Sequence, residues 1–302
     1  MTALTSFDAA RPGDFGIIGD PVAHSLSPVM QNAALEHWWK ISGKEPAQAP
    51  RYHLFPTTAA QVPEALRLMR EKKLAGLNVT VPHKTSVVPL LDGLHTFAST
   101  VGAVNTVKNE NGRLVGYNTD GMGFERAVTE DMAVTPDVAL VLGAGGTGQV
   151  IVHQLLAMDV HRIYWWNRTP GKLAQLIERL PEGESVREMD DEELEQACRE
   201  SDLIINATSV GLKEGDGLPA NGLMFSAEQG VFDVVYHRPT AFLQAAETAG
   251  AFACGGLPML LHQGAAAFEI WTGENAPVDL MRKALDATLK EKGISPIWPS
   301  AI

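Results

Sequence analysis

A glycine-rich segment near the middle of the chain has the spacing of a phosphate-binding turn. Gly143, Gly145 and Gly148 follow the pattern G-x-G-x-x-G, directly after the apolar run Val138–Leu142. In such a turn the first glycine permits a tight bend, the second lets the backbone approach a pyrophosphate, and the third allows close helix packing. The N-terminus of the helix that follows adds oriented N–H groups that attract an anion. We therefore predict a dinucleotide site that includes Gly143, Ala144, Gly145, Gly146, Thr147 and Gly148.

The next predicted strand, Arg162–Trp166, indicates which dinucleotide is bound. In NAD sites an acidic residue at the end of this strand accepts hydrogen bonds from the ribose 2′-hydroxyl. Here the strand is followed by Asn167, Arg168 and Thr169, and Lys172 comes shortly afterwards. A guanidinium suits a 2′-phosphate through paired, charge-assisted hydrogen bonds, so the sequence favours NADP as the cofactor. The alternative is a surface arginine beside a helix that Thr169 caps.

Three further segments place polar groups near predicted strand ends. Ser25 and Ser27 precede a helix that Pro28 would begin, and two hydroxyls at a helix start suit a carboxylate. Lys84 follows one predicted strand, and Asp120 follows another. Each residue also has an ordinary interpretation, because Ser27 and Asp120 are good helix caps and most lysines are surface charges.

The apolar pattern around these segments predicts an α/β protein. Predicted strands span residues 15–19, 52–55, 77–81, 104–107, 114–117, 138–142, 162–166, 203–205 and 231–234, and predicted helices span 28–39, 59–73, 170–180, 259–292 and the stretch from the glycine turn to 158. Asn109–Gly112 is typical of a hairpin turn. The βαβ succession in the second half predicts a doubly wound parallel sheet.

Two domains are expected from this order. Residues 1–120 and 258–302 would form an α/β substrate-binding domain, and residues 121–257 would form a Rossmann-type, doubly wound NADP-binding domain. The C-terminal helices would return to pack on the first domain, and the active site would lie in the cleft between the domains.

Composition and charge exclude several classes of function. The 302-residue chain is 45% hydrophobic and 20% charged, as in a folded protein, and its formal net charge of -12 disfavours nucleic-acid binding. The two cysteines, Cys198 and Cys254, are far apart and outside any metal-ligand spacing, which favours a reducing compartment and no metal site. No apolar run could span a bilayer, and Met1–Arg11 lacks a secretory pattern. We expect a cytoplasmic protein without a membrane partner.

Together these motifs resemble the shikimate dehydrogenase family, which includes the quinate/shikimate dehydrogenases. The resemblance extends from Gly16 to about Trp271. Besides the segments above, it includes Gly102–Thr106, Asn206–Ser209 and Gly256–Gln263. Several separated motifs in the right order are more specific than any one of them.

The resemblance implies a role for each matching residue. Ser25 and Ser27 would hold a substrate carboxylate. The other residues that it groups around the substrate are Asn78, Thr80, Asn105, Tyr236 and Gln263, of which Thr80, Asn105 and Gln263 would bond ring hydroxyls. Those that it groups around the cofactor, beyond the glycine turn, are Asn167, Arg168, Thr169, Lys172, Thr208 and Gly256.

Lys84 and Asp120 would flank the hydroxyl or ketone that reacts. Reducing a ketone requires a hydride donor on one face and a proton donor at the oxygen. We expect Lys84 to be the main acid/base, and Asp120 to be its partner and an anchor for the substrate. The neighbouring His83 is interpreted as structural, and residues 36–52 match no family role.

The expected reaction is the NADP-linked interconversion of 3-dehydroshikimate and shikimate. A first alternative is oxidation of quinate or an aminoshikimate in the same pocket. A second is a non-catalytic, NADP-sensing regulatory protein, which would not need both Lys84 and Asp120. The partner is expected to be a small molecule, and the sequence is compatible with a monomer or a homodimer.

Overall fold

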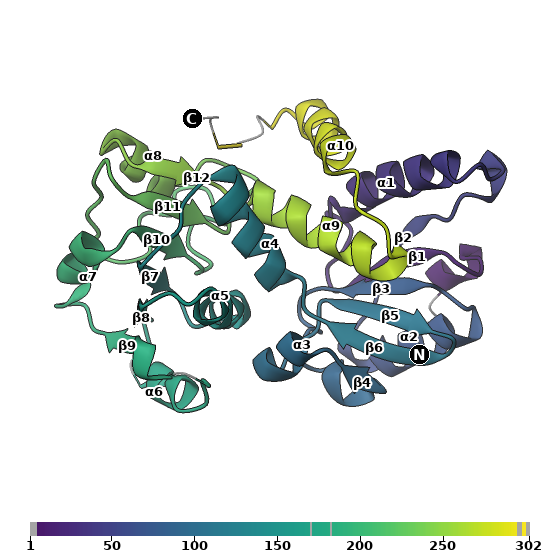
Figure 1. Cartoon of the computed structure of the whole chain (residues 1–302), viewed down its shortest axis with the longest axis horizontal. Helices are drawn as coiled ribbons and strands as arrows, with labels where there is room; N and C mark the ends of the chain where they lie inside the picture. The colour runs from purple at the N-terminus through teal and green to yellow at the C-terminus, as the bar shows by residue number, and fades with distance from the viewer. Residues whose placement is uncertain (1–4, 170, 182, 295–297, 300–302) are drawn as a thin grey trace. The chain divides into compact units, whose positions relative to one another are not determined.

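The computed structural model describes residues 5–169, 171–181, 183–294 and 298–299, which form two compact α/β units (Figure 1). The first unit contains the chain up to Thr119 together with Gln263–Glu291. The second unit is formed mainly by Asp120–His262. In the part of the chain that is described, no helix is both long and apolar enough to cross a membrane.

A six-stranded sheet forms the centre of the first unit. Its strands are β1 (Phe15–Gly19), β2 (Tyr52–Pro56), β3 (Gly76–Val79), β4 (Gly93–Leu94), β5 (Thr106–Glu110) and β6 (Arg113–Tyr117). Its helices are α1 (Ser27–Ile41), α2 (Val62–Glu71), α3 (Thr96–Val101), the second part of α9 (Leu257–Thr272) and α10 (Val278–Glu291), with short 3-10 helices η1 (Thr5–Ala9), η2 (Pro46–Gln48), η3 (Ala59–Gln61) and η4 (Val88–Leu90).

The direction of the strands in this sheet brings several strand ends to one edge. The order is β2-β1-β3-β5-β6-β4, and β5 runs antiparallel to both β3 and β6 while the other pairs are parallel. The N-terminal end of β5 therefore lies at the same edge as the C-terminal ends of β1, β3 and β6. The segments that follow or precede these ends carry most of the substrate residues expected from the sequence.

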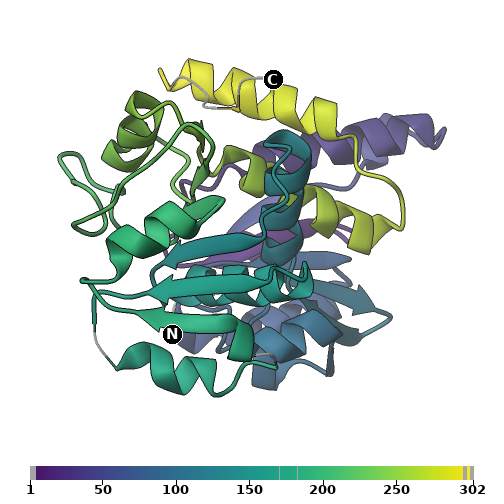
Figure 2. The ribbon, with the colours of Figure 1, turned by 60° about the vertical axis from the view of Figure 1, so that its left-hand side comes forward.

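Helices cover both faces of this sheet. On one face α2 and α3 pack over a core that includes Phe55, Leu66 and Leu77. On the other face α9 lies so close that a side chain at Gly76 would overlap the Trp271 indole. Figure 2 shows α10 (yellow) beside α1 (purple), and the two helices are in contact. α10 and the part of α9 from Gln263 onward thus pack on the first unit.

A six-stranded parallel sheet forms the centre of the second unit. Its strands are β7 (Val138–Leu142), β8 (Arg162–Trp166), β9 (Val186–Met189), β10 (Leu203–Asn206), β11 (Gly230–Asp233) and β12 (Phe252–Cys254). Its helices are α4 (Asp120–Arg126), the π-helical turn η5 (Ala127–Asp131), α5 (Gly146–Ala157), α6 (Lys172–Ile177), the 3-10 helix η6 (Gly183–Ser185), α7 (Leu194–Glu200), α8 (Ala241–Thr248) and the first part of α9.

The strand order β12-β11-β10-β7-β8-β9 is that of a doubly wound Rossmann fold. The central strand shows why its sequence is continuously apolar. Ala139 and Val141 face a core formed with α4 and α5, while Leu140 and Leu142 face a second core formed with α7 and α8. Both faces are covered, so no polar alternation is required. The predicted fold class is confirmed.

The start of α1 differs from the prediction that Ser27 is its N-cap. The helix begins at Ser27, and Leu26 is the N-cap residue without a side-chain cap. The Ser27 N–H donates instead to Oγ of Ser25 at 3.2 Å. Ser25 therefore supplies the oxygen for this first turn, which leaves the buried Ser27 hydroxyl available for other partners.

Several element bounds also differ. The predicted strand 77–81 ends at Val79. The predicted helix 170–180 is observed as α6, and its N-cap is Gly171, in the left-handed conformation, rather than Thr169; Pro170 lies outside the described residues. The helical tail is divided between α9 and α10 near Gly273, which has a φ of 75°. Elements that the sequence did not predict are β4, β9, β12, α3, α4 and α8.

Asp14, just before β1, is a buried carboxylate that bonds to the segments preceding β1 and β2. It accepts hydrogen bonds from the backbone N–H groups of Arg11 and Arg51, each at 2.9 Å, and Nε2 of His53 lies 2.8 Å from its Oδ2. Burial raises the pKa of Asp14, but the hydrogen bonds from His53, Arg11 and Arg51 outweigh burial. The pKa therefore lies below its ordinary value of 3.8.

Asp14→Asn is expected to lower the free energy of unfolding at pH 7 by about 1–3 kcal/mol, because an amide cannot accept all of these hydrogen bonds. Since the pKa is lower in the folded state, the stabilising contribution is present above about pH 4 and is lost as pH falls through the lowered pKa. Denaturant unfolding of both proteins at pH 7 and at about pH 3 measures this effect. A stability difference that stays constant with pH would contradict it.

Candidate active site

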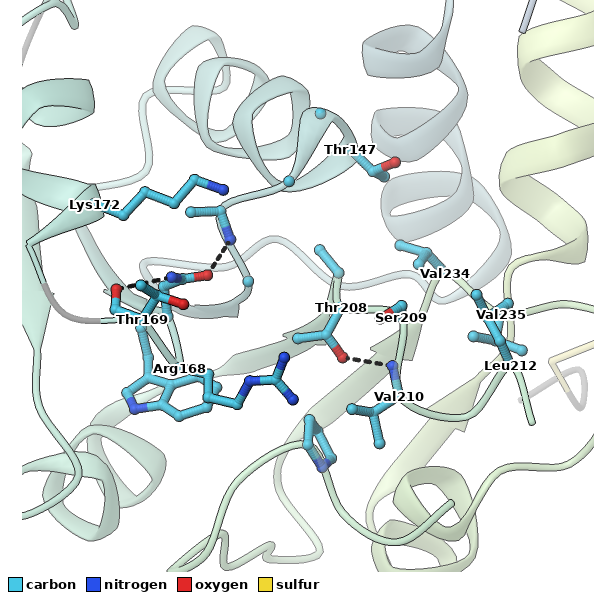
Figure 3. Close-up of a pocket in the computed structure, with 18 of the residues that line it drawn as sticks. Thr147, Arg168, Thr169, Lys172, Thr208, Ser209, Val210, Leu212, Val234 and Val235 are labelled. Carbon is cyan, nitrogen blue, oxygen red and sulfur yellow. Dashed lines mark hydrogen bonds between the residues drawn. The ribbon is translucent and has the colours of Figure 1, made fainter. Parts of the chain in front are cut away.

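The second unit contains a cavity of about 510 Å³ at the C-terminal ends of β7, β8, β10 and β11 (Figure 3). This edge is where open parallel sheets bind their ligands. The predicted cofactor residues that line it are Gly143, Ala144, Gly145, Gly146, Thr147, Asn167, Arg168, Thr169, Lys172 and Thr208. The structure therefore brings together residues from three separate sequence motifs.

The glycine turn has the geometry that its spacing predicts. Gly143 has a φ of +106°, which disfavours any other residue. A Cβ at Gly148 would overlap the carbonyl oxygen of Gly143, so this glycine permits the close approach of α5 to the end of β7. At Gly145 and Gly146, in contrast, a Cβ would meet no atom within 4 Å. The open space lies beside the N-terminus of α5, which suits an anion.

One side of the cavity carries two cationic side chains. Figure 3 shows Lys172 and Arg168 on the same side of the pocket as Thr169, and both cations are exposed. Asn167 holds the loop in place, because its Oδ1 accepts from the Ala144 N–H at 3.1 Å and its Nδ2 donates to the Thr169 carbonyl at 3.0 Å. Asn167 thus links the glycine turn to the loop that carries Arg168.

The other side of the cavity is held by a buried polar cluster. Asn206 donates to Oδ1 of Asp233 at 3.0 Å, and its own Oδ1 accepts from the N–H and hydroxyl of Thr208. Asp233 also accepts from the Val235 N–H and, at 2.6 Å, from the Thr240 hydroxyl. Burial raises the pKa of Asp233 despite these hydrogen bonds. The cluster fixes the two loops that follow β10 and β11.

Some lining residues were not expected from the sequence. Trp166, His237 and the apolar side chains of Val210, Leu212 and Val234 also line the cavity. The signal that could have found them is their position just after parallel strands, at the edge where ligands bind. Tyr236, which we predicted to approach the substrate, lines the same cavity, and burial raises its pKa.

Two of the predicted cofactor residues are not among the described residues that line the cavity. Gly148 packs against Gly143, as described above. Gly256 lies against the backbone of Val234, whose carbonyl oxygen a Cβ at Gly256 would overlap. Both glycines thus support the walls of the cavity by permitting close backbone packing.

The first unit carries the remaining polar residues, except Asp120, which begins α4 in the second unit. Ser25 and Ser27 follow β1, and Thr80 and Lys84 follow β3. Asn105 precedes the antiparallel strand β5, which places it at the same edge of the sheet. Gln263 lies in the part of α9 that belongs to this unit.

The backbone near these residues is held by buried hydrogen bonds. Oδ1 of Asn105 accepts from the Thr119 N–H at 2.7 Å, which fixes the chain just before Asp120. The Lys84 carbonyl accepts from the Val104 N–H at 2.8 Å. His83 is buried, and its Nε2 lies 2.6 Å from the Thr57 carbonyl oxygen, a contact that fits a structural role.

Asn78 has most of its hydrogen-bonding capacity occupied within the protein. Its Nδ2 donates to the Asn105 carbonyl and to the Thr106 hydroxyl, and its Oδ1 accepts from the Tyr52 hydroxyl at 2.6 Å.

No group of three or more His, Cys, Asp or Glu side chains that could hold a metal ion occurs among the described residues.

Comparison with known proteins identifies the family. Residues 17–107 match the model of the shikimate dehydrogenase substrate binding domain, residues 127–212 that of shikimate / quinate 5-dehydrogenase, and residues 256–285 that of the shikimate 5'-dehydrogenase C-terminal domain. A shikimate dehydrogenase (NADP(+)) of Methanopyrus kandleri is 39% identical over 297 residues, which cover 94% of this chain and 98% of the relative. The chain belongs to the shikimate dehydrogenase family.

Solved structures of the family have the same fold. A shikimate 5-dehydrogenase from Thermus thermophilus in complex with NADP(H) and shikimate has a TM-score of 0.78 and 35% identity, covering 92% of this chain and 100% of that chain. A quinate dehydrogenase from Corynebacterium glutamicum in complex with NAD has a TM-score of 0.80 and 27% identity, covering 92% and 99%. Family membership thus rests on both sequence and structure.

Two alanine substitutions in the glycine turn are expected to affect different properties, the stability of the second unit and the affinity for the dinucleotide. Gly148→Ala should destabilise the second unit by about 1–3 kcal/mol, because its Cβ would overlap the Gly143 carbonyl. Gly145→Ala should leave the melting temperature unchanged but weaken dinucleotide binding, because its Cβ would enter the open space. Thermal unfolding and calorimetric titration with NADP measure the two effects. Equal behaviour of the two variants would contradict this account of the turn.

Proposed function

We propose that this chain catalyses the NADP-linked interconversion of 3-dehydroshikimate and shikimate. The observation that carries the proposal is the cavity of the second unit, where an open glycine turn and two exposed cations lie at the ends of parallel strands. The family match supports the choice of substrate, since the Methanopyrus kandleri relative is named a shikimate dehydrogenase (NADP(+)).

The residues present fit a phosphorylated dinucleotide. The space beside Gly145 and Gly146 suits a pyrophosphate, and the N-terminus of α5 adds favourable N–H groups. Arg168 and Lys172 suit the 2′-phosphate that distinguishes NADP from NAD, because both are cations and no acidic residue follows β8 directly. When bound, the reduced nicotinamide supplies the hydride for the ketone carbon.

The proton chemistry is assigned to Lys84 and Asp120. The ammonium of Lys84 donates a proton at the substrate oxygen and stabilises the negative charge that develops there. The carboxylate of Asp120 orients the same hydroxyl and anchors the substrate. Support comes from the match of both residues to the family motifs and from the hydrogen bonds that fix the backbone next to each of them.

The remaining polar residues of the first unit hold the substrate in this proposal. Ser25 and Ser27 bind its carboxylate, and Thr80, Asn105 and Gln263 bind its ring hydroxyls. Asn78 belongs to the same group, and we assign it a supporting role because its side chain is already bonded to Asn105 and Tyr52. We also assign Tyr236, which lines the cavity of the second unit, to substrate binding.

Quinate is the principal alternative substrate, since a quinate dehydrogenase shares the fold with a TM-score of 0.80. Its identity of 27% is lower than the 35% and 39% of the two shikimate dehydrogenases, which favours shikimate.

We also propose a cytoplasmic enzyme that acts as a monomer or a homodimer. Both cysteines are buried free thiols, which fits a reducing compartment.

Arg168→Ala is expected to raise the KM for NADPH about 10- to 100-fold, because a charge-assisted hydrogen bond to the 2′-phosphate is lost. The KM for NADH should change little, since NADH lacks that phosphate. Steady-state reduction of 3-dehydroshikimate with each cofactor measures the effect. The matched control is Arg162→Ala, at the opposite end of β8, which should alter neither constant. An equal rise for both cofactors would contradict the assignment of Arg168.

Lys84→Ala is expected to lower kcat at least about 100-fold, because the proton donor at the ketone oxygen is removed. NADP affinity should be retained, since the proposed cofactor residues lie in the second unit. Absorbance assays with 3-dehydroshikimate and NADPH, and NADP titration of the variant, measure both quantities. Lys40→Ala, an exposed lysine of α1, serves as the control. Near-normal turnover by Lys84→Ala would refute the assignment.

A further inference from the structure

The side-chain amide of Asn105 belongs to a buried group of hydrogen bonds whose directions are set by backbone atoms. Its members Asn78, Asn105, Thr106 and Thr119 are each at most 5% exposed. A side-chain amide has two donors on its nitrogen and one acceptor oxygen, so its orientation decides what it can bind. A backbone N–H only donates and a backbone carbonyl only accepts, so contacts with the backbone determine the orientation of each amide.

Oδ1 of Asn105 faces donors of the protein. The backbone N–H of Thr119 donates to it at 2.7 Å, and the Thr106 hydroxyl donates to it at 3.0 Å. The Thr119 hydroxyl is a third neighbour of this oxygen, at 3.2 Å. A side-chain carbonyl oxygen has two lone pairs, and the bonds from Thr119 N–H and from Thr106 use both of them. The acceptor of Asn105 is therefore occupied within the protein.

Asn78 sets the direction of the bond from Thr106. Nδ2 of Asn78 lies 3.0 Å from the Asn105 carbonyl oxygen, which can only accept, so this end of the Asn78 amide is the donor. The same nitrogen donates to the Thr106 hydroxyl oxygen at 2.9 Å. The Thr106 hydrogen must then point to another acceptor, and Oδ1 of Asn105 is closer than the Thr119 hydroxyl oxygen at 3.3 Å.

Thr119 orients the nitrogen of the Asn105 amide. Nδ2 donates to the Thr119 hydroxyl oxygen at 2.9 Å. Thr119 thus bonds to both ends of the amide, with its N–H at the oxygen and its hydroxyl at the nitrogen. Turning the amide over would place two donors, Nδ2 and the Thr119 N–H, against each other, which is unfavourable in a buried site. The second N–H of Nδ2 can only donate, whichever partner it meets.

We propose that this arrangement makes Asn105 an obligatory hydrogen-bond donor to the substrate, so that the site selects a ring position that carries an oxygen and rejects one that carries an ammonium group. This inference rests on the proposed function, in which Asn105 bonds a ring hydroxyl. The hydroxyl oxygen accepts from Nδ2 and directs its own hydrogen elsewhere. An ammonium group has no lone pair, so it faces Nδ2 as a second donor. Thr119 is the positioning residue that prevents the amide from adapting.

Pairs of shikimate analogues test the direction of this bond. For each ring hydroxyl, one analogue has hydrogen in its place and the other has an amino group, which is protonated at about pH 7. Inhibition constants are measured against shikimate oxidation by the wild-type chain. At one ring position at least, the amino analogue should bind about tenfold or more weakly than the deoxy analogue, because two donors face each other. Amino analogues that all bind as well as their deoxy partners would overturn the inference.

Asn105→Ala identifies the ring position. The amide is removed without a change of charge, so the amino-to-deoxy ratio of inhibition constants should fall about tenfold at one position and stay constant at the others. An amide that could turn its oxygen toward the ammonium would give the opposite result, since its removal would then raise the ratio. A ratio that rises, or that changes at no position, contradicts the proposal.

Thr119→Val tests the positioning role separately. It removes the hydroxyl that accepts from Nδ2 and retains the backbone N–H. The KM for shikimate should rise about tenfold and the amino-to-deoxy ratio should fall at the same ring position, while the KM for NADP stays unchanged. Thr119→Ser, which keeps a hydroxyl, should restore both quantities. A lower melting temperature with an unchanged ratio would make Thr119 merely a core residue and overturn its assignment.

Thr272→Val is the matched control. The Thr272 hydroxyl, at the end of α9, bonds only to backbone groups, those of Phe268 and Glu274. This variant should change neither the KM for shikimate nor any amino-to-deoxy ratio. Failure of the proposed function has a different signature, because the wild-type chain would then oxidise no shikimate, and the inference would fall with it.

Discussion

Close packing of Gly148 against the carbonyl of Gly143 is the contact on which the cofactor pocket depends. A Cβ at position 148 would overlap that oxygen, so only glycine lets α5 start directly beside the end of β7. A Cβ at Gly145 or Gly146, at the start of α5, would instead enter open space. Asn167 connects the glycine turn to the loop that follows β8, because its Oδ1 accepts a hydrogen bond from the Ala144 N–H. The cations of that loop consequently share one cavity with the glycine turn.

In the first unit, the direction of the strands brings polar residues together at one edge of the sheet. Because β5 runs antiparallel to β3 and β6, its N-terminal end and the preceding Asn105 lie at the edge where β1, β3 and β6 end. Hydrogen bonds among buried side chains then connect β2, β3 and β5, from Tyr52 through Asn78, Thr106 and Asn105 to the Thr119 backbone. A polar network of this kind is stable only when its members are satisfied, which favours one arrangement of the edge. A rigid edge is suited to a small ring with hydroxyls and a carboxylate.

Sequence reasoning was reliable where one local rule dominates. The apolar run Val138–Leu142 and the glycine turn were recognisable because both faces of a central strand are buried and because only glycine fits the bend. Short elements such as β4 and β12 have too few residues to show a period. The N-cap of α1 was misassigned to Ser27, because Ser27 is already the first residue of the helix and Leu26 is its N-cap. The Ser27 N–H bonds instead to Oγ of Ser25. The hydrogen bond of Tyr52 to Asn78 could not be predicted, since the two residues come from distant segments.

The central claim is that Lys84 and Asp120 act on one substrate oxygen beside a bound nicotinamide. A crystal structure of the chain with both shikimate and NADP tests it most directly. The account predicts that Nζ of Lys84 and a carboxylate oxygen of Asp120 each lie about 2.7–3.2 Å from the same ring hydroxyl. It would be contradicted by a complex in which either side chain faces solvent away from the ring, or in which the cofactor pyrophosphate lies away from Gly145.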